Sequence, residues 1–240
     1  MVDHNKRLYT LENPKLSKST INSYLKCPFA FHKRYVEGDD RLDKENKAYE
    51  FGSNVHTLLE EFYNPKTTNI DLLAYEAIKH PLFQEYSWIM RKFIDFNHKL
   101  KTELGDNFIP YFKELKIQDP DKNISGIIDR VQFDGKDFMI VDYKQRGADY
   151  EETENENLRK YRFELALYTY LFEKSTGNKV KWWGVYFAQN GKLQYEPVDR
   201  NEINTALKLV DETRENINKE IRGETQVHKC GRCEYCKTYG

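Results

Sequence analysis

The 240-residue sequence lacks several features that would assign it to a class at once. Its formal net charge is only −1, because 38 Lys and Arg residues nearly balance 39 Asp and Glu residues. The chain as a whole therefore has no basic signature for nucleic acid. No apolar run approaches the length of a membrane span, and no secretory pattern opens the sequence. We expect a cytoplasmic protein with no membrane partner, in which any DNA-binding surface is local.

Cysteine is also scarce, and its distribution is informative. The chain has four cysteines, and three of them fall within seven residues near a polar end of the chain: Cys27, Cys230, Cys233 and Cys236. In a reducing compartment such clustering favours metal binding over disulfides. Four thiolates satisfy either one [4Fe–4S] cluster or one Zn²⁺, while free thiols are the third interpretation. A shared metal would tie the C-terminal tail to the first helix, coupling metal binding to folding.

What is present is the composition of a folded, mixed α/β protein, with 39% hydrophobic and 32% charged residues. We predict one domain over residues 1–240, with an N-terminal helical segment at 16–38, a core at 114–188 and a Cys-rich tail at 226–240. Periodicity and turn residues predict helices over 17–26, 29–35, 48–64, 82–105, 157–177 and 201–223, and strands over 111–118, 124–133, 136–144, 179–188 and 192–198. This order predicts a single mixed sheet flanked by helices.

Two aspartates fall opposite each other if the strands at 124–133 and 136–144 form a hairpin. A turn centred on Gly135-Lys136 makes opposed residues sum to 271, which places Asp129 opposite Asp142. A turn at Asp134-Gly135 instead slips the register by one and places Asp129 opposite Ile140. We favour the first register because it keeps the apolar residues available for packing. Opposed carboxylates lie about 5 Å apart at Cβ and are destabilising unless a positive group lies between them.

The acids are accompanied by a lysine. Asp142 and Lys144 are two residues apart at a strand end and share one face, an arrangement that suits either a plain ion pair or half of a metal-dependent hydrolase. Glu114, on the preceding strand, would fall near residues 127–129 if a second hairpin forms. Oxygen ligands from three strands suit Mg²⁺ or Mn²⁺, and Lys144 would then orient a metal-bound water or help to deprotonate it. His56, on the predicted helix at 48–64, is either a structural histidine or a further ligand.

These motifs in their order resemble the RecB-like branch of the PD-(D/E)xK nuclease superfamily. The sequence "GIIDR" around Asp129, "VDYK" ending at Lys144 and the upstream Glu114 resemble its catalytic core, and "GSNVH" ending at His56 resembles its Gly-x-x-x-His element. The resemblance spans about residues 16–240. It is nearest in architecture to small iron–sulfur CRISPR-associated exonucleases and to stand-alone phage or bacterial exonucleases.

The resemblance implies roles for these residues. It implies a restriction-endonuclease-like core in which His56, Glu114, Asp129, Asp142 and the backbone carbonyl of Tyr143 hold Mg²⁺ or Mn²⁺. It favours iron–sulfur over zinc at the four cysteines, which would tie N- and C-terminal helices into a cap. The substrate that it implies is DNA, in particular single-stranded DNA ends. Recombination or CRISPR-type protein partners are unspecified.

Two departures from the family pattern stand out. Where the family has Gln-x-x-x-Tyr on the helix after the catalytic strands, this chain has Glu164 and Tyr168, which share a helix face. We expect these two residues, with Arg159 and Arg162, to line the substrate path. The tail is Cys-x2-Cys-x2-Cys rather than Cys-x2-Cys-x5-Cys, which weakens the cluster assignment. The leading hypothesis is a metal-dependent DNA exonuclease; a non-catalytic DNA-binding or adaptor protein and a zinc-stapled DNA-binding module are the alternatives.

Overall fold

The structure, a computed structural model, describes residues 14–39, 47–146 and 154–239. The chain groups into two compact units. The central unit comprises residues 45–117 and 127–202, and the terminal unit comprises residues 1–44, 118–126 and 203–240. Each is described by itself below, and the interpretation of residues 1–240 as one domain stays a prediction.

The sheet is mixed, as the sequence predicts, and it has six strands where the sequence predicted five, because the short β1 was not expected. The strands are β1 (Leu16–Ser17), β2 (Phe112–Asp119), β3 (Ile124–Phe133), β4 (Phe138–Lys144), β5 (Val180–Phe187) and β6 (Lys192–Pro197). Their order is β1-β3-β4-β5-β6, and β2 also pairs with β3. Strands β4 and β5 are parallel, while β3–β4 and β5–β6 are antiparallel pairs.

The register of the β3–β4 hairpin is the predicted one. Arg130 pairs with Val141 and Val131 pairs with Ile140, so opposed residues sum to 271 and Asp129 stands level with Asp142. The turn is closed by Asp134, whose side chain accepts hydrogen bonds from the backbone N–H groups of Lys136 and Asp137. This turn chemistry excludes the slipped register, in which Asp129 would have faced Ile140.

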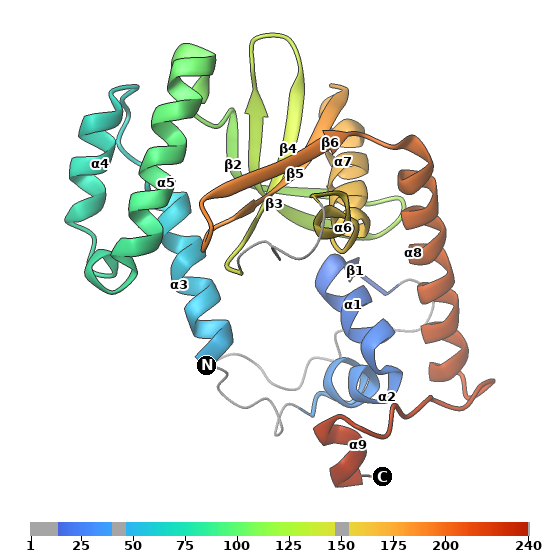
Figure 1. The fold of residues 1–240 in the computed structure, drawn as a ribbon. Helices are drawn as coiled ribbons and strands as arrows, with labels where there is room; N and C mark the ends of the chain where they lie inside the picture. Colours follow the sequence, from blue (N-terminus) through green and yellow to red (C-terminus); the bar gives the residue numbers. More distant parts are fainter. Residues whose placement is uncertain (1–13, 40–46, 147–153, 240) are drawn as a thin grey trace. The chain divides into compact units, whose positions relative to one another are not determined.

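Helices cover both faces of the sheet in the central unit (Figure 1). On one face lie α3 (Lys47–Glu61), α4 (Ile70–Ile78) and α5 (Phe83–Leu104), followed by the 3₁₀ turn η2 (Gly105–Phe108). Their apolar side chains form a core with Val141, Tyr143 and Tyr186 of the strands. On the other face α7 (Arg162–Thr176) packs against β4 and β5, and the short α6 (Glu154–Arg159) precedes it. The sheet is therefore enclosed where β4 passes between the two layers.

Most predicted helices lie within a few residues of their expected bounds. Ser17 caps its helix, and Gly105 ends α5 in a conformation with φ 59°. The helix expected over 157–177 is instead two helices, α6 and α7. Helix α4 was not predicted, although Asn69 caps it by accepting from the N–H groups of Asp71 and Leu72.

The terminal unit joins segments from both ends of the chain. Its helices are α1 (Lys18–Lys26), α2 (Pro28–Phe31), the π-helical turn η1 (His32–Val36), most of α8 (Arg200–Ile221) and α9 (Glu234–Tyr239). In this unit β1 runs parallel to the first residues of β3. Glu220 of α8 accepts a hydrogen bond from the Tyr24 hydroxyl and lies 2.9 Å from His32 Nε2. These polar contacts fasten α1 and η1 to α8.

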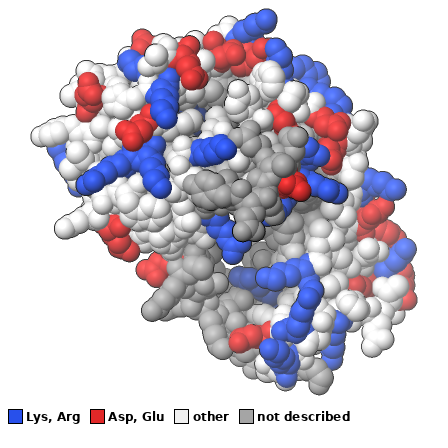
Figure 2. Space-filling model, viewed as in Figure 1, with Lys and Arg blue, Asp and Glu red and all other residues white. Residues whose placement is uncertain are grey.

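The surface carries charge of both signs. On the face drawn in Figure 2, Lys and Arg side chains are interspersed with Asp and Glu side chains. Among the residues that the structure describes, no helix is long and apolar enough to cross a membrane.

Candidate metal centres

The first candidate centre is in the central unit and is built around Asp129. Its carboxylate is 8% exposed, and Oδ2 accepts a 2.6 Å hydrogen bond from the backbone N–H of Tyr143 on the neighbouring strand. This bond holds the side chain at the end of the β3–β4 pair. His56 of α3 approaches the same oxygen, with 3.1 Å between Nε2 and Oδ2.

Glu114 completes a group of three. One nitrogen of His56 and one oxygen each from Glu114 and Asp129 lie within 4.8 Å of one another. Glu114 sits on β2 with φ 45°, a left-handed conformation that is uncommon for a residue with a side chain. Its Oε1 is buried without a hydrogen-bond partner among the described residues, and it lies 3.6 Å from His56 Nδ1. A buried, unbonded carboxylate oxygen fits a position meant for a cation.

His56 holds a proton in this arrangement. Burial lowers the pKa of the imidazole, but the close contact with Asp129 and the negative charges of Asp129 and Glu114 outweigh it and raise the pKa to about 10. The imidazolium therefore supplies positive charge where the two carboxylates meet, and a cation that binds His56 would displace this proton.

Asp142 and Lys144 share one face of β4, as predicted, but Asp142 stands outside the three-residue group. Its Oδ2 lies 2.5 Å from Lys144 Nζ, and the same ammonium lies 2.7 Å from Glu164 Oε2 of α7. Burial opposes the ammonium form, but Asp142 and Glu164 raise the pKa of Lys144 well above its usual range. Lys144 is thus a cation held between two carboxylates, which suits it to orient a reactant rather than to remove a proton.

Two further side chains at this centre were not singled out from the sequence. Glu60 lies one helical turn after His56, and burial together with the charge of Glu114 raises its pKa. The spacing from His56 could have revealed it. Gln145 follows Lys144 and its buried Oε1 has no hydrogen-bond partner among the described residues. A Cβ on Gly52 would lie 2.8 Å from that oxygen, so the glycine leaves room for the Gln145 side chain.

The residues expected to line a substrate path differ in their surroundings. Tyr168 is buried, and that burial, with the charge of Asp142, raises the pKa of its hydroxyl. Arg159 is exposed. Arg162 is engaged elsewhere, because Nε and Nη2 each lie 2.8 Å from an oxygen of Glu196. A phosphate would have to compete with that bidentate pair for Arg162.

The donor set of the first centre fits a small divalent cation. Carboxylate oxygens and an imidazole nitrogen suit Mg²⁺ or Mn²⁺, and Mn²⁺ tolerates the nitrogen better. The described partners place His56, Glu114 and Asp129 together, whereas the ligand roles of Asp142 and the Tyr143 carbonyl stay predictions.

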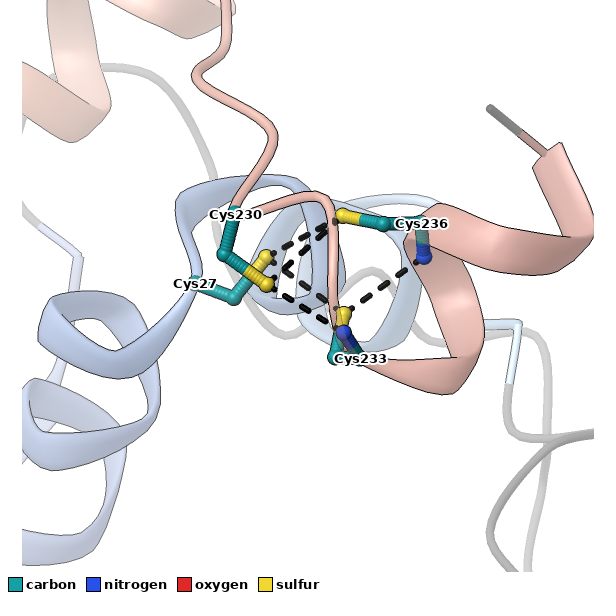
Figure 3. Close-up of side chains that lie close together, drawn as sticks. All are labelled: Cys27, Cys230, Cys233 and Cys236. Atoms are coloured by element: carbon teal, nitrogen blue, oxygen red, sulfur yellow. Dashed lines mark hydrogen bonds between the residues drawn. The ribbon is translucent and has the colours of Figure 1, made fainter.

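The second candidate centre lies in the terminal unit, where the four cysteines meet (Figure 3). Cys27 joins α1 to α2 and its sulfur accepts from the N–H of Ala30. The other three come from the tail and from α9, and the four sulfurs converge on one point. Backbone N–H groups of Arg232 and Cys233 lower the pKa of the Cys230 thiol to about 6, which favours the thiolate that metals bind.

Three of the sulfur–sulfur separations are short and nearly equal, and all four sulfurs lie within 4.8 Å of one another. Cys27 lies 3.6 Å from both Cys236 and Cys233, and Cys230 lies 3.9 Å from Cys236. Four thiolates about 2.3 Å from one Zn²⁺ occupy tetrahedral corners about 3.8 Å apart. In a [4Fe–4S] cluster each thiolate binds a different iron, so the sulfurs lie farther apart than around one shared ion. The donors fit either metal chemically, and their spacing matches a single tetrahedral ion.

Comparisons with known proteins agree with this architecture. A family model described as the PD-(D/E)XK nuclease superfamily matches residues 15–238. Comparison with curated protein sequences gave no match. Among solved structures, the chain is similar to a crystal structure from Eubacterium rectale named "Putative exonuclease", with a TM-score of 0.62 and 14% identity over 93% of this chain and 87% of that chain. At that identity the likeness concerns the fold.

Proposed function

Because the chain belongs to the PD-(D/E)XK nuclease superfamily, we propose that it is a Mg²⁺- or Mn²⁺-dependent deoxyribonuclease that hydrolyses DNA from its ends, single strands in particular. The observation that carries the proposal is the convergence of His56, Glu114 and Asp129 near the half-buried Lys144. The name of the Eubacterium rectale protein supports an exonuclease over an endonuclease.

Each residue of the centre has a proposed task. His56, Glu114 and Asp129 hold the cation. Asp142 is proposed as a fourth ligand, whose carboxylate also contacts Lys144. A divalent ion bound there would neutralise phosphate charge and make water a better nucleophile at neutral pH. Lys144, kept protonated by Asp142 and Glu164, donates hydrogen bonds that orient the attacking water or the scissile phosphate. Tyr168, Arg159 and Arg162 are proposed to line the DNA path.

The test is digestion of end-labelled single- and double-stranded DNA with Mn²⁺. We expect Asp142→Ala and Lys144→Ala to reduce cleavage at least 100-fold while DNA is still bound, because each removes charge placed at the reacting phosphate. Asp71→Ala is the matched control, since that aspartate is 85% exposed on α4. Full activity in Asp142→Ala would refute the site. If the wild-type protein binds DNA but does not cleave it with any divalent ion tested, the non-catalytic DNA-binding alternative would be favoured.

At the four cysteines we propose one tetrahedral Zn²⁺, which departs from the [4Fe–4S] cluster that the family resemblance favours. The support is that three sulfur–sulfur separations lie between 3.6 and 3.9 Å, with all four sulfurs within 4.8 Å of one another. Anaerobic purification followed by metal analysis tests it: we expect one zinc per chain and no colour. A brown protein with iron, sulfide and absorption at about 400 nm would establish the iron–sulfur alternative instead.

A further inference from the structure

A cavity of about 300 Å³ lies on the α5 side of the sheet in the central unit. Its walls are mainly aromatic and aliphatic, with Phe96 and Leu100 from α5 and Trp182 and Tyr186 from β5. Arg130 of β3 also lines it. A cavity of this size, with apolar walls and a few polar groups, has the character of a small-molecule site.

Arg130 is an unusual wall residue because its charge is buried and unmatched. Its side chain is 2% exposed, and the guanidinium donates to the Gln132 amide oxygen, the Tyr63 hydroxyl and the Phe108 carbonyl. All these acceptors are neutral. Within residues 14–39, 47–146 and 154–239 no carboxylate forms an ion pair with Arg130. A buried ion without a counterion is costly by several kcal/mol, and buried charges in proteins are ordinarily paired.

A second polar group on the wall is unsatisfied. Tyr186 is fully buried, and its hydroxyl has no hydrogen-bond partner in the described part of the chain. The ring of Tyr186 lies 4.8 Å from that of Phe96, and the Arg130 guanidinium lies 5.9 Å from the Phe96 ring. A hydrogen-bond donor and a cation therefore flank the same aromatic wall.

Three carboxylates also line the cavity, but they do not neutralise Arg130. Asp134 is engaged by backbone N–H groups of its own turn, and Asp137 lies 2.7 Å from Lys181. Glu103 is exposed and solvated. Exposed charges are screened by water and salt within about 10 Å, whereas a buried charge is screened much less. The buried guanidinium therefore favours an anionic ligand. The three acids, of which Asp137 is half-buried and paired with Lys181, disfavour ligands with several negative charges.

We propose that this cavity binds a small aromatic monoanion, such as an aromatic carboxylate. Its ring lies among Phe96, Trp182 and Tyr186, and its anionic group accepts from the Tyr186 hydroxyl next to Arg130. The site is separate from the proposed catalytic centre. Val141 and Tyr143 line the cavity, whereas Asp142 between them points to the opposite face of β4.

The test compares three probes with the same ring system and different charge: 2-naphthoate, 2-naphthalenemethanol and 2-naphthylmethylamine. Binding to the full chain is measured by titration calorimetry. We expect 2-naphthoate to bind at least tenfold more tightly than the other two, and Tyr186→Phe to weaken it about fivefold, the effect of losing one hydrogen bond of about 1 kcal/mol. Leu100→Trp, which fills the cavity from half-buried α5, should abolish binding of all three.

The outcomes separate cleanly. Equal or tighter binding of the amine would show that the acids decide and would overturn the proposal, as would no binding by any probe. Undiminished binding to Leu100→Trp would place the probe elsewhere and also overturn it. Both variants should keep the wild-type melting temperature within a few degrees and the wild-type DNA cleavage, if any. Failure of the nuclease proposal would therefore leave this result unaffected.

Discussion

Replacing Glu164 with Gln tests the departure that sets this chain apart from the family pattern. In the structure Lys144 has two carboxylate partners, Asp142 at 2.5 Å and Glu164 at 2.7 Å. When a divalent ion binds the Asp142 carboxylate, Glu164 still neutralises the Lys144 ammonium. In Glu164→Gln, Asp142 is the remaining carboxylate partner in this trio, so a metal must compete with Lys144 for it. The substitution restores the family residue and is nearly isosteric.

The size of the effect follows from the lost charge. A hydrogen bond to a charged group contributes about 1.5–3 kcal/mol and a neutral one about 1 kcal/mol. Because Gln keeps a hydrogen bond from Lys144 but lacks the carboxylate charge, the loss is about 0.5–2 kcal/mol, or about 2- to 30-fold in an equilibrium constant. We expect the Mn²⁺ concentration for half-maximal cleavage to rise by that factor, with a smaller change in the rate at saturating Mn²⁺.

The assay is a Mn²⁺ titration of DNA cleavage by the wild type, Glu164→Gln and Glu173→Gln. Glu173 is a matched control because it lies on the same helix, about 13 Å along its axis, and pairs with Arg200 and Lys179 instead. Its removal should leave the Mn²⁺ dependence unchanged. An unchanged Mn²⁺ dependence in Glu164→Gln, or a collapse of the saturated rate alone, would refute the reasoning and point to contact with DNA.

Two further substitutions should change stability in opposite directions. Gly52→Ala should raise the melting temperature, because Ala is favoured over Gly in a helix by about 1 kcal/mol. It should also lower cleavage several-fold, because the added Cβ displaces the amide of Gln145, the residue after Lys144. A variant with an unchanged melting temperature and unchanged cleavage would contradict this prediction. Glu173→Gln should be less stable than the wild type at pH 7 in chemical denaturation, and this difference should shrink as the pH falls below 4.5. Burial raises the pKa of Glu173, but bonds from the Val180 N–H, Arg200 and Lys179 outweigh it and lower the pKa below the ordinary 4.5. The stabilisation is therefore present above that value and is lost on acidification.

The sequence predicted most of what depends on local chemistry. The β3–β4 register followed from a short polar turn, and with it came the positions of Asp129, Asp142 and Lys144. Cap residues such as Ser17 located helix starts, and the same logic applied to Asn69 would have found α4.

What the sequence did not predict depends on distances across the fold. Nothing in the spacing of Glu164 indicates that it would pair with Lys144, because that contact depends on where α7 packs against β4. The left-handed backbone of Glu114 is likewise set by its surroundings and not by its residue type. The cavity beside Arg130 is formed by three segments far apart in sequence, so periodicity contains no sign of it.

The two metal centres should differ in how far the fold depends on them. At the carboxylate centre each aspartate already has a cationic partner, since His56 lies 3.1 Å from Asp129 and Lys144 lies 2.5 Å from Asp142. The positive charge that opposed aspartates require is therefore supplied by the protein. Dialysis into metal-free buffer should leave the protein folded. Its melting temperature should fall only by the lost mass-action stabilisation, which is about 2.7 kcal/mol, or about 5–10 °C, for an ion at 100 times its Kd.

The cysteine centre has no such substitute. Helix α9 has six residues, too few to be stable alone, and it is fastened by Cys236 together with hydrogen bonds from Tyr235 and Tyr239 to Asp39. A mercurial that displaces the thiolate ligands should free the tail, so that trypsin cleaves after Arg232 and Lys237 at least tenfold faster, as followed by mass spectrometry. Cleavage of the exposed Lys66, in the central unit, is the internal control. Equal rates at the tail with and without the mercurial would show that the four thiols do not hold a structural ion, whatever metal the purified protein contains.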